Sequence, residues 1–299
     1  MNTSLARLPK YFCLHQNPSS KSCRCTTMDA GLLFNQKIMY LSNDLQINTP
    51  RALTRNPILR TTSLSTFQRI VESFSLIGFS KSETSRIFDM HPILLTADLD
   101  RYFYPVIEFL LNEASIPLPD IPKAISRCPR LLVTSVPNRL RPNLEYLTSL
   151  GFASPKSINS QTTLLLVYDK DTTFKWKMEF LRGLGFQMRE VKKMVVRSPA
   201  ILTYSVEKNM KPKAEYYVDE MKKDLNELKG FPQFFSFSLE GKIKRRHRML
   251  VRNGIEMSVA EMLKASDEKF GALMAEMTLR RCDIWSRNSN FWMPDRIFS

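Results

Sequence analysis

Short apolar clusters recur along the chain, each directly after a proline, with a period near 35 residues. The clusters follow Pro57, Pro92, Pro129, Pro199 and Pro232. Successive prolines are 35, 37, 70 and 33 positions apart, and the gap of 70 holds Thr163-Leu164-Leu165-Leu166, a copy without the proline. A fixed period of this length is typical of solenoids, in which supersecondary units stack along one axis. The pattern therefore predicts a repeat protein.

Each unit is predicted to contain two helices and a short apolar corner. Counting the first proline as position 0, a second proline recurs at position 13, as Pro105, Pro142 and Pro212. Proline is tolerated in the first turn of a helix, so amphipathic helices are expected to start at these three residues.

The ends of the helices carry their own signals. A glycine with an apolar neighbour follows several first helices, and glycine is the usual stop at a helix C-terminus. Ser80–Glu83 and Ser258–Glu261 are capping boxes that predict the start of a second helix. The next proline ends that helix, because the residue before a proline avoids the helical region.

We therefore expect an all-α superhelical solenoid, right- or left-handed, of about seven two-helix units. A degenerate copy near Gly254 and Glu268 gives the seventh unit. The array is expected over residues 46–281. Residues 1–45 are expected to form a transit peptide and disordered segment, and residues 282–299 a divergent C-terminal tail.

The net charge of +15 and the pI near 9.7 indicate an anionic partner, either nucleic acid or a membrane surface. No run of 18 apolar residues occurs, so a transmembrane helix is not expected. The nine glycines, the scattered histidines and the five cysteines without zinc-ligand spacing support neither catalysis nor a metal site. We expect a protein that is not an enzyme and has no cofactor.

The first 28 residues contain no acidic side chain but seven serines and threonines, together with Arg7, Lys10, Lys21 and Arg24. This composition is typical of an organelle transit peptide. The modest arginine and high hydroxyl content favour a chloroplast over a mitochondrion. The alternative is a disordered basic tail that stays attached.

A basic residue recurs at position 12 of the unit. Five of the six residues there are basic: Arg69, Tyr104, Arg141, Lys175, Lys211 and Lys244. In stacked repeats these side chains are expected to form one row that suits a phosphate backbone. The alternative is that each cation pairs with the glutamate at position 16, one helical turn away.

The densest basic cluster lies within residues 242–252, where no acidic residue occurs. The cluster costs stability unless it is solvated or faces an anion, so a solvated face and nucleic-acid contact are both open. Together with Arg69 and Lys175, the candidate contacts are Arg139, Arg141, Lys208, Lys211, Lys213, Lys242, Lys244, Arg245, Arg246 and Arg248.

Three proline–leucine motifs resemble those of the mitochondrial transcription termination factor family, in its plant branch. They are His91-Pro92-Ile93-Leu94-Leu95, Cys128-Pro129-Arg130-Leu131-Leu132 and Ser198-Pro199-Ala200-Ile201-Leu202. The segments 231–240 and 244–248 are also similar to the family. The resemblance covers about residues 56–281, while the sequence from Cys282 onward departs from it.

The resemblance implies a half-doughnut superhelix with a basic concave groove that holds double-stranded nucleic acid inside an organelle. We expect a monomeric regulator of transcription, acting by termination or related control on duplex DNA. One alternative is an RNA-directed factor for intron splicing or ribosomal RNA maturation. Another is a scaffold for an acidic protein partner. Backbone contacts alone do not name a target sequence.

Overall fold

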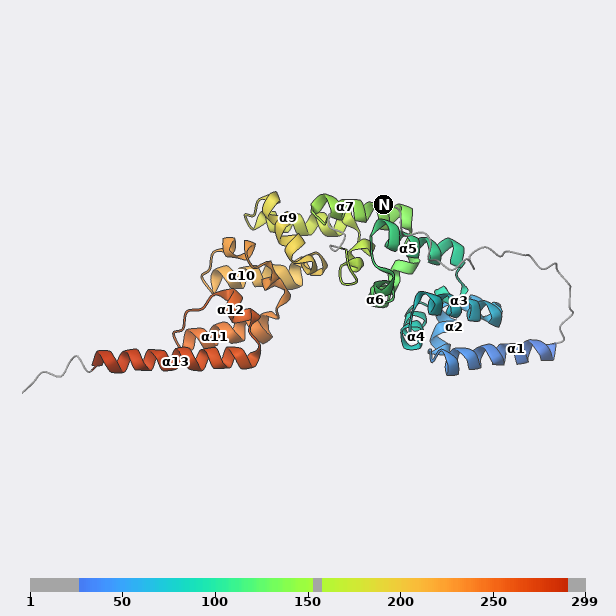
Figure 1. Ribbon diagram of the computed structural model, residues 1–299, viewed down its shortest axis with the longest axis horizontal. Coiled ribbons are helices and arrows are strands. Elements are labelled where there is room, and N and C mark those ends of the chain that lie inside the picture. Colours follow the sequence, from blue (N-terminus) through green and yellow to red (C-terminus); the bar gives the residue numbers. More distant parts are fainter. Residues whose placement is uncertain (1–26, 153–157, 290–299) are drawn as a thin grey trace, which may run out of the picture.

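The computed structural model describes residues 27–152 and 158–289, which contain helices and turns but no strand. The helices follow one another along an arch, from α1 at one end to α13 at the other (Figure 1). The expected all-α solenoid is confirmed. The α-helices are α1 (Thr27–Met39), α2 (Thr49–Arg55), α3 (Leu64–Ile77), α4 (Lys81–Met90), α5 (Tyr104–Glu108), α6 (Ile121–Arg127), α7 (Arg141–Leu150), α8 (Lys175–Gly183), α9 (Met188–Arg197), α10 (Lys211–Asp219), α11 (Arg245–Arg252), α12 (Val259–Lys264) and α13 (Asp267–Ser289).

Each apolar cluster forms a short 3-10 turn at the corner of its unit. The turns that open units one to six are Pro57–Arg60, Pro92–Thr96, Pro129–Val133, Thr163–Val167, Pro199–Thr203 and Pro232–Ser236. The side chain at position 2 enters the core in all six units and that at position 3 in units two to six, as Leu131 and Leu132 do with at most 1% exposed. Burial of these apolar side chains is the main favourable contribution to stacking. The copy that lacks a proline, at Thr163, is thus confirmed.

The proline itself controls the backbone just before the corner. Cys128, before Pro129, has φ −137° and ψ 74°, because the proline ring excludes the helical region for the preceding residue. Thr162 precedes a threonine instead and keeps φ −96° and ψ −13°. The proline therefore sharpens the end of the preceding helix, but the corner forms without it.

The first helix of each unit begins earlier than its second proline. In unit three the Ser135 Oγ accepts a hydrogen bond from the Asn138 N–H at 3.3 Å, and the chain is helical from Val136. The opening turn is a π-helical turn, called the wide turn below, because the Leu140 N–H donates to the Ser135 carbonyl, five residues back. Pro142 consequently lies in the first turn of α7, directly after the wide turn.

The predicted α-helix starts at Pro105, Pro142 and Pro212 are confirmed to within one residue, since α5, α7 and α10 begin at Tyr104, Arg141 and Lys211. The wide turn that precedes each of them was not predicted. A wide turn displaces the carbonyl with which a proline ring would clash in a regular α-helix. The copies with Trp176 and Arg245 in place of proline have the same wide turn. The wide turn thus belongs to the repeat and makes proline acceptable at position 13.

The predicted helix ends are confirmed. Gly78 and Gly151 close α3 and α7 with φ of 99° and 115°, a left-handed conformation that favours glycine. Both capping boxes are present at the start of α4 and α12, where Glu83 and Glu261 accept from the backbone of their capping serines. Each box satisfies amide groups that the helix leaves unpaired.

Two units depart from the two-helix prediction. Residues 158–162, before the Thr163 corner, form turns, and a 3-10 helix, Leu225–Lys229, stands in place of the second helix before Pro232. The seventh unit also differs, because α13 follows α12 within a few residues and no 3-10 corner forms near Glu268.

The described part of the predicted disordered segment is helical. Residues 27–44 form α1 and a wide turn, with Leu41 buried, and the Lys37 Nζ donates to the carbonyls of Arg60 and Thr62 at 2.5 and 3.0 Å. The expected disorder is therefore wrong for residues 27–44. Residues 1–26, which contain most of the predicted transit peptide, lie outside the described residues. At the other end, α13 continues past the predicted boundary at residue 282 to Ser289.

Candidate nucleic-acid interface

The position 12 side chains lie on the first helices, beside the first helix of the preceding unit. The Lys244 Nζ is 5.5 Å from the ring centroid of Tyr216, and the Arg141 guanidinium forms two hydrogen bonds of 2.6 and 2.7 Å with Glu113. Tyr104 contacts Ser73 in the same way, through hydroxyl groups 3.3 Å apart. The row at position 12 thus follows the stacking direction of the units.

These cations do not pair with the glutamate at position 16. Lys175 pairs with Asp171 at 2.6 Å and Lys244 with Glu240 at 2.5 Å, each four residues upstream, and Arg141 pairs with Glu113. The pairing alternative is therefore wrong in the form predicted. The hydrogen bonds from Arg141 lower the pKa of Glu113. Exposed pairs of this kind contribute little stability and exchange readily for other partners.

Two predicted nucleic-acid contacts are buried in the core. The side chain of Arg246 is completely buried, and its guanidinium donates to the carbonyls of Met262 and Ala265 and to Asp267. Lys213 is 4% exposed and donates to the Phe235 carbonyl at 2.7 Å. Neither side chain reaches a ligand on the surface, so the prediction of phosphate contact is wrong for Arg246 and Lys213.

Lys213 belongs to a second polar row, at position 14, that the sequence analysis missed. Asn143, Lys177 and Lys213 occupy this position in units three to five, and each donates to the carbonyl at position 3 of the next unit. Burial lowers the pKa of both lysines to about 8. The row connects neighbouring units and satisfies buried carbonyls. The alignment of the units on their first prolines, which revealed position 12, also places these three residues at one position.

The remaining candidate contacts fall into two groups, those that form an ion pair or a ring contact and those that are exposed without an ion pair. Arg139 pairs with Asp169, the cap of the next first helix, at 3.0 Å, and the pKa of Asp169 falls to about 2 mainly through hydrogen bonds from Thr172. Arg245 pairs with Asp267, and the Lys242 Nζ lies 4.8 Å from the Phe237 ring centroid. Candidates that are exposed and form no ion pair within the described part of the chain are Arg69, Lys208, Lys211 and Arg248.

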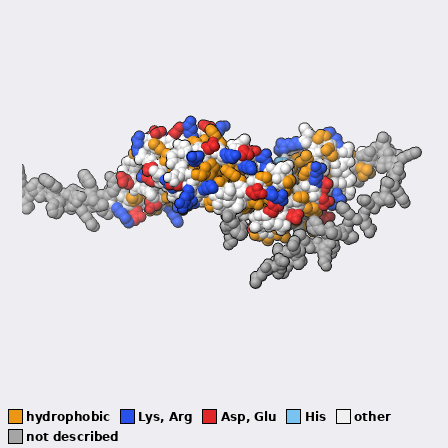
Figure 2. All heavy atoms as spheres, turned by 90° about the horizontal axis from the view of Figure 1, so that it is seen from above, with side chains coloured by type: hydrophobic (Ala, Val, Ile, Leu, Met, Phe, Trp, Pro, Cys, Tyr) orange, Lys and Arg blue, Asp and Glu red, His pale blue; other side chains and the backbone are white. Residues whose placement is uncertain are grey.

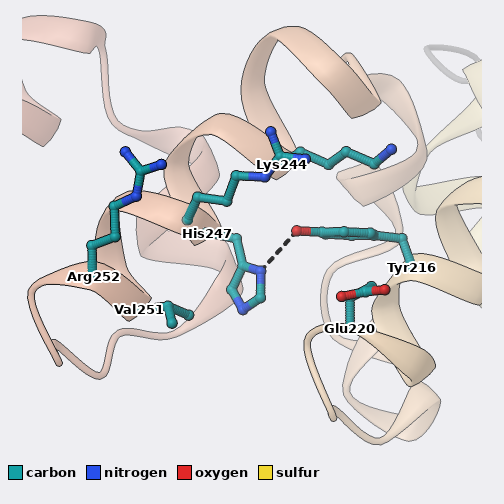
Figure 3. Close-up of a pocket in the computed structure, with 7 residues that line it drawn as sticks. Tyr216, Glu220, Lys244, His247, Val251 and Arg252 are labelled. Atoms are coloured by element: carbon teal, nitrogen blue, oxygen red, sulfur yellow. Dashed lines mark hydrogen bonds between the residues drawn. The ribbon is translucent and has the colours of Figure 1, made fainter.

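The strongest gathering of cations surrounds a hollow between α10 and α11. This basic hollow has a volume of about 450 Å³, and its lining residues are Tyr216, Glu220, Lys244, His247, Arg248, Val251 and Arg252 (Figure 3). Lys244, Arg248 and Arg252 are spaced by four residues, so they lie on one face of the helix. Among the described residues, Arg248 and Arg252 have no carboxylate partner. Arg252 was not among the predicted contacts, although the four-residue spacing was visible in the sequence.

A hydrogen bond between neighbouring units forms one wall of the basic hollow. The Tyr216 hydroxyl lies 2.8 Å from the His247 Nδ1, and the two rings meet edge to face (Figure 3). Burial lowers the pKa of His247, so the imidazole is neutral at pH 7, and burial raises the pKa of Tyr216. The phenol is the stronger donor, which places the imidazole proton on Nε2.

The upper surface of the arch carries charges of both signs. Seen from above, Lys and Arg side chains are mixed with Asp and Glu side chains (Figure 2). Mixed charges suit solvation rather than binding of a polyanion.

The described residues contain no helix long and apolar enough to cross a bilayer, and no group of three possible metal ligands.

A model of the mTERF family matches residues 119–271, just over half of the 299 residues. The chain belongs to the mTERF family. The matched region begins before α6 and includes α11 and the basic hollow.

Curated mTERF relatives come from plants. The chain is 36% identical over 116 residues to transcription termination factor MTERF4, chloroplastic, of Arabidopsis thaliana, covering 39% of the chain and 21% of the relative. It is 31% identical over 173 residues to MTERF2, chloroplastic, of the same plant, covering 58% and 22%. With MTERF8, chloroplastic, it is 26% identical over 239 residues, covering 78% and 46%. The aligned segments thus span less than half the length of each relative.

Proposed function

We propose that this mTERF chain acts in the chloroplast as a nucleic-acid-binding regulator of transcription, through termination or related control. It holds double-stranded DNA along the concave side of the arch, and the basic hollow makes the principal phosphate contact. The relatives named as chloroplastic transcription termination factors support the compartment and the process. The observation that carries the binding is the line of Lys244, Arg248 and Arg252 beside the hollow.

The chemistry of this line suits a phosphate backbone. Arginine presents a planar fork of donors that matches phosphate oxygens, and the two arginines have no carboxylate to displace within the described residues. Lys244 would exchange Glu240, an exposed partner, for a phosphate. Binding of this kind releases counterions and weakens steeply as salt rises.

The test measures affinity against salt for a 30-base-pair DNA duplex and for an RNA stem-loop of similar charge. The Arg248→Gln/Arg252→Gln variant is expected to reduce the slope of log Kd against log salt by about two, because each lost phosphate contact removes about 0.9. The control is Arg189→Gln/Lys193→Gln, which removes two exposed cations with the same spacing from α9.

Equal slopes for the two variants would overturn the proposed site. A clear preference for the RNA at fixed salt would instead favour splicing or ribosomal RNA maturation as the process served by the same site.

A further inference from the structure

Four glutamates occupy position 16 in consecutive units. Units two to five have Glu108, Glu145, Glu179 and Glu215, all exposed and without an ion pair among the described residues. Each lies one helical turn from a position 12 residue. Arg141 and Lys175 form their ion pairs with other carboxylates, and Lys211 forms none among the described residues. The pKa of Arg141 is raised mainly by Glu113 and also by Glu145, and that of Lys175 mainly by Asp171 and also by Glu179. The array therefore displays a row of carboxylates directly beside its row of cations. In unit six the same position is Arg248.

A second hollow lies at the equivalent place of the preceding unit, and the net charge of its position 12, 16 and 20 residues has the opposite sign. One unit before the basic hollow, Lys211, Glu215 and Asp219 line a hollow between α8 and α10, together with the apolar Phe180 and Leu184. These three charged residues occupy positions 12, 16 and 20, as Lys244, Arg248 and Arg252 do in unit six. The two linings therefore place equivalent positions on equivalent surfaces.

The summed charge of positions 12, 16 and 20 changes abruptly between units five and six. The charges at positions 12, 16 and 20 sum to +1 in unit one, −1 in unit two, 0 in units three and four, −1 in unit five and +3 in unit six. A phosphate next to position 12 of units two to five would also meet a carboxylate, which repels it and stays unneutralised. In unit six the same phosphate meets three cations, against the single carboxylate, Glu220, that lines this hollow.

We propose that Glu145, Glu179 and Glu215, with Glu108, exclude phosphate contact from units two to five and leave the three cations of unit six as the principal contact. The mTERF array then grips nucleic acid at its C-terminal end rather than along the whole position 12 row. The glutamates set the length of the contact and limit non-specific affinity. This inference rests on the proposed function, because it concerns the ligand of the basic hollow.

The test replaces three glutamates of the row, as Glu145→Gln/Glu179→Gln/Glu215→Gln. Its control is Glu207→Gln/Glu256→Gln/Glu268→Gln, which removes three exposed glutamates outside the row and changes the net charge equally. Binding of a 30-base-pair DNA duplex is measured at several salt concentrations, and the protected length is mapped by hydroxyl-radical footprinting.

The row variant is expected to bind roughly tenfold more tightly than wild type near 0.1 M salt, with a steeper salt slope and a longer footprint, because more phosphates are neutralised. The control is expected to gain affinity only slightly and to keep the wild-type footprint. Equal gains in the two variants, or no gain in either, would overturn the inference and leave the proposed function intact. Absence of salt-dependent binding by the wild-type chain would remove both.

Discussion

The Lys213 Nζ in unit five donates a hydrogen bond of 2.7 Å to the Phe235 carbonyl at the corner of unit six. Lys177 makes the same contact with Leu202 one unit earlier, and the Asn143 side-chain amide contacts Leu166 at 2.7 Å. A carbonyl buried at the corners of units four, five and six thus receives a donor from the preceding unit. The polar row at position 14 is therefore a structural connection between repeats, distinct from the binding surface.

We expect Lys213→Met to lower the free energy of unfolding by about 1–3 kcal/mol, since hydrogen bonds to charged groups contribute on this scale and the variant leaves a buried carbonyl without a donor. Methionine keeps the apolar stem of the side chain. Urea denaturation followed by circular dichroism measures the change.

The matched control for this stability measurement is Lys211→Met, two residues away, where the lysine is exposed and no buried carbonyl depends on it. This variant is expected to be as stable as wild type. If Lys213→Met proved equally stable, the connection would contribute no net stability, as happens when the cost of desolvating a charge cancels its bonds.

The same lysine makes stability depend on alkaline pH. The pKa of Lys213 is about 8 in the folded chain and about 10.4 in an unfolded chain. The folded chain therefore holds fewer protons between these values, and the free energy of unfolding rises with pH through that window. We expect the stability difference between wild type and Lys213→Met to grow from pH 8 to pH 10. Urea titrations at half-unit intervals measure it, and parallel curves for the two proteins would exclude the shift.

The sequence predicted the repeat well because its signals are local. Proline before an apolar pair, glycine at a helix end and a serine–glutamate capping box each act on a few neighbouring residues. The corner at Thr163 could be placed even without its proline, since the period and the buried leucines remain.

The candidate site was harder to predict, because it depends on which helix face meets the neighbouring unit. Lys211 and Lys213 are the same residue type two positions apart, and about 200° of helical rotation separates them. One lysine faces solvent and the other is buried. Charge and spacing alone predicted nucleic-acid contact for both lysines.

The central claim is that nucleic acid contacts unit six at position 16 and avoids the same position of unit five. A photoreactive benzoylphenylalanine placed at Val251 or, in a separate variant, at Val218 compares two equivalent exposed positions on α11 and α10 that line the two hollows, and it leaves Arg248 and Glu215 in place. After irradiation with a labelled DNA duplex, the crosslinked fraction is measured on a denaturing gel. The account predicts a strong crosslink from position 251 and a weak one from position 218. Equal crosslinking from both positions, or a stronger crosslink from position 218, would contradict it.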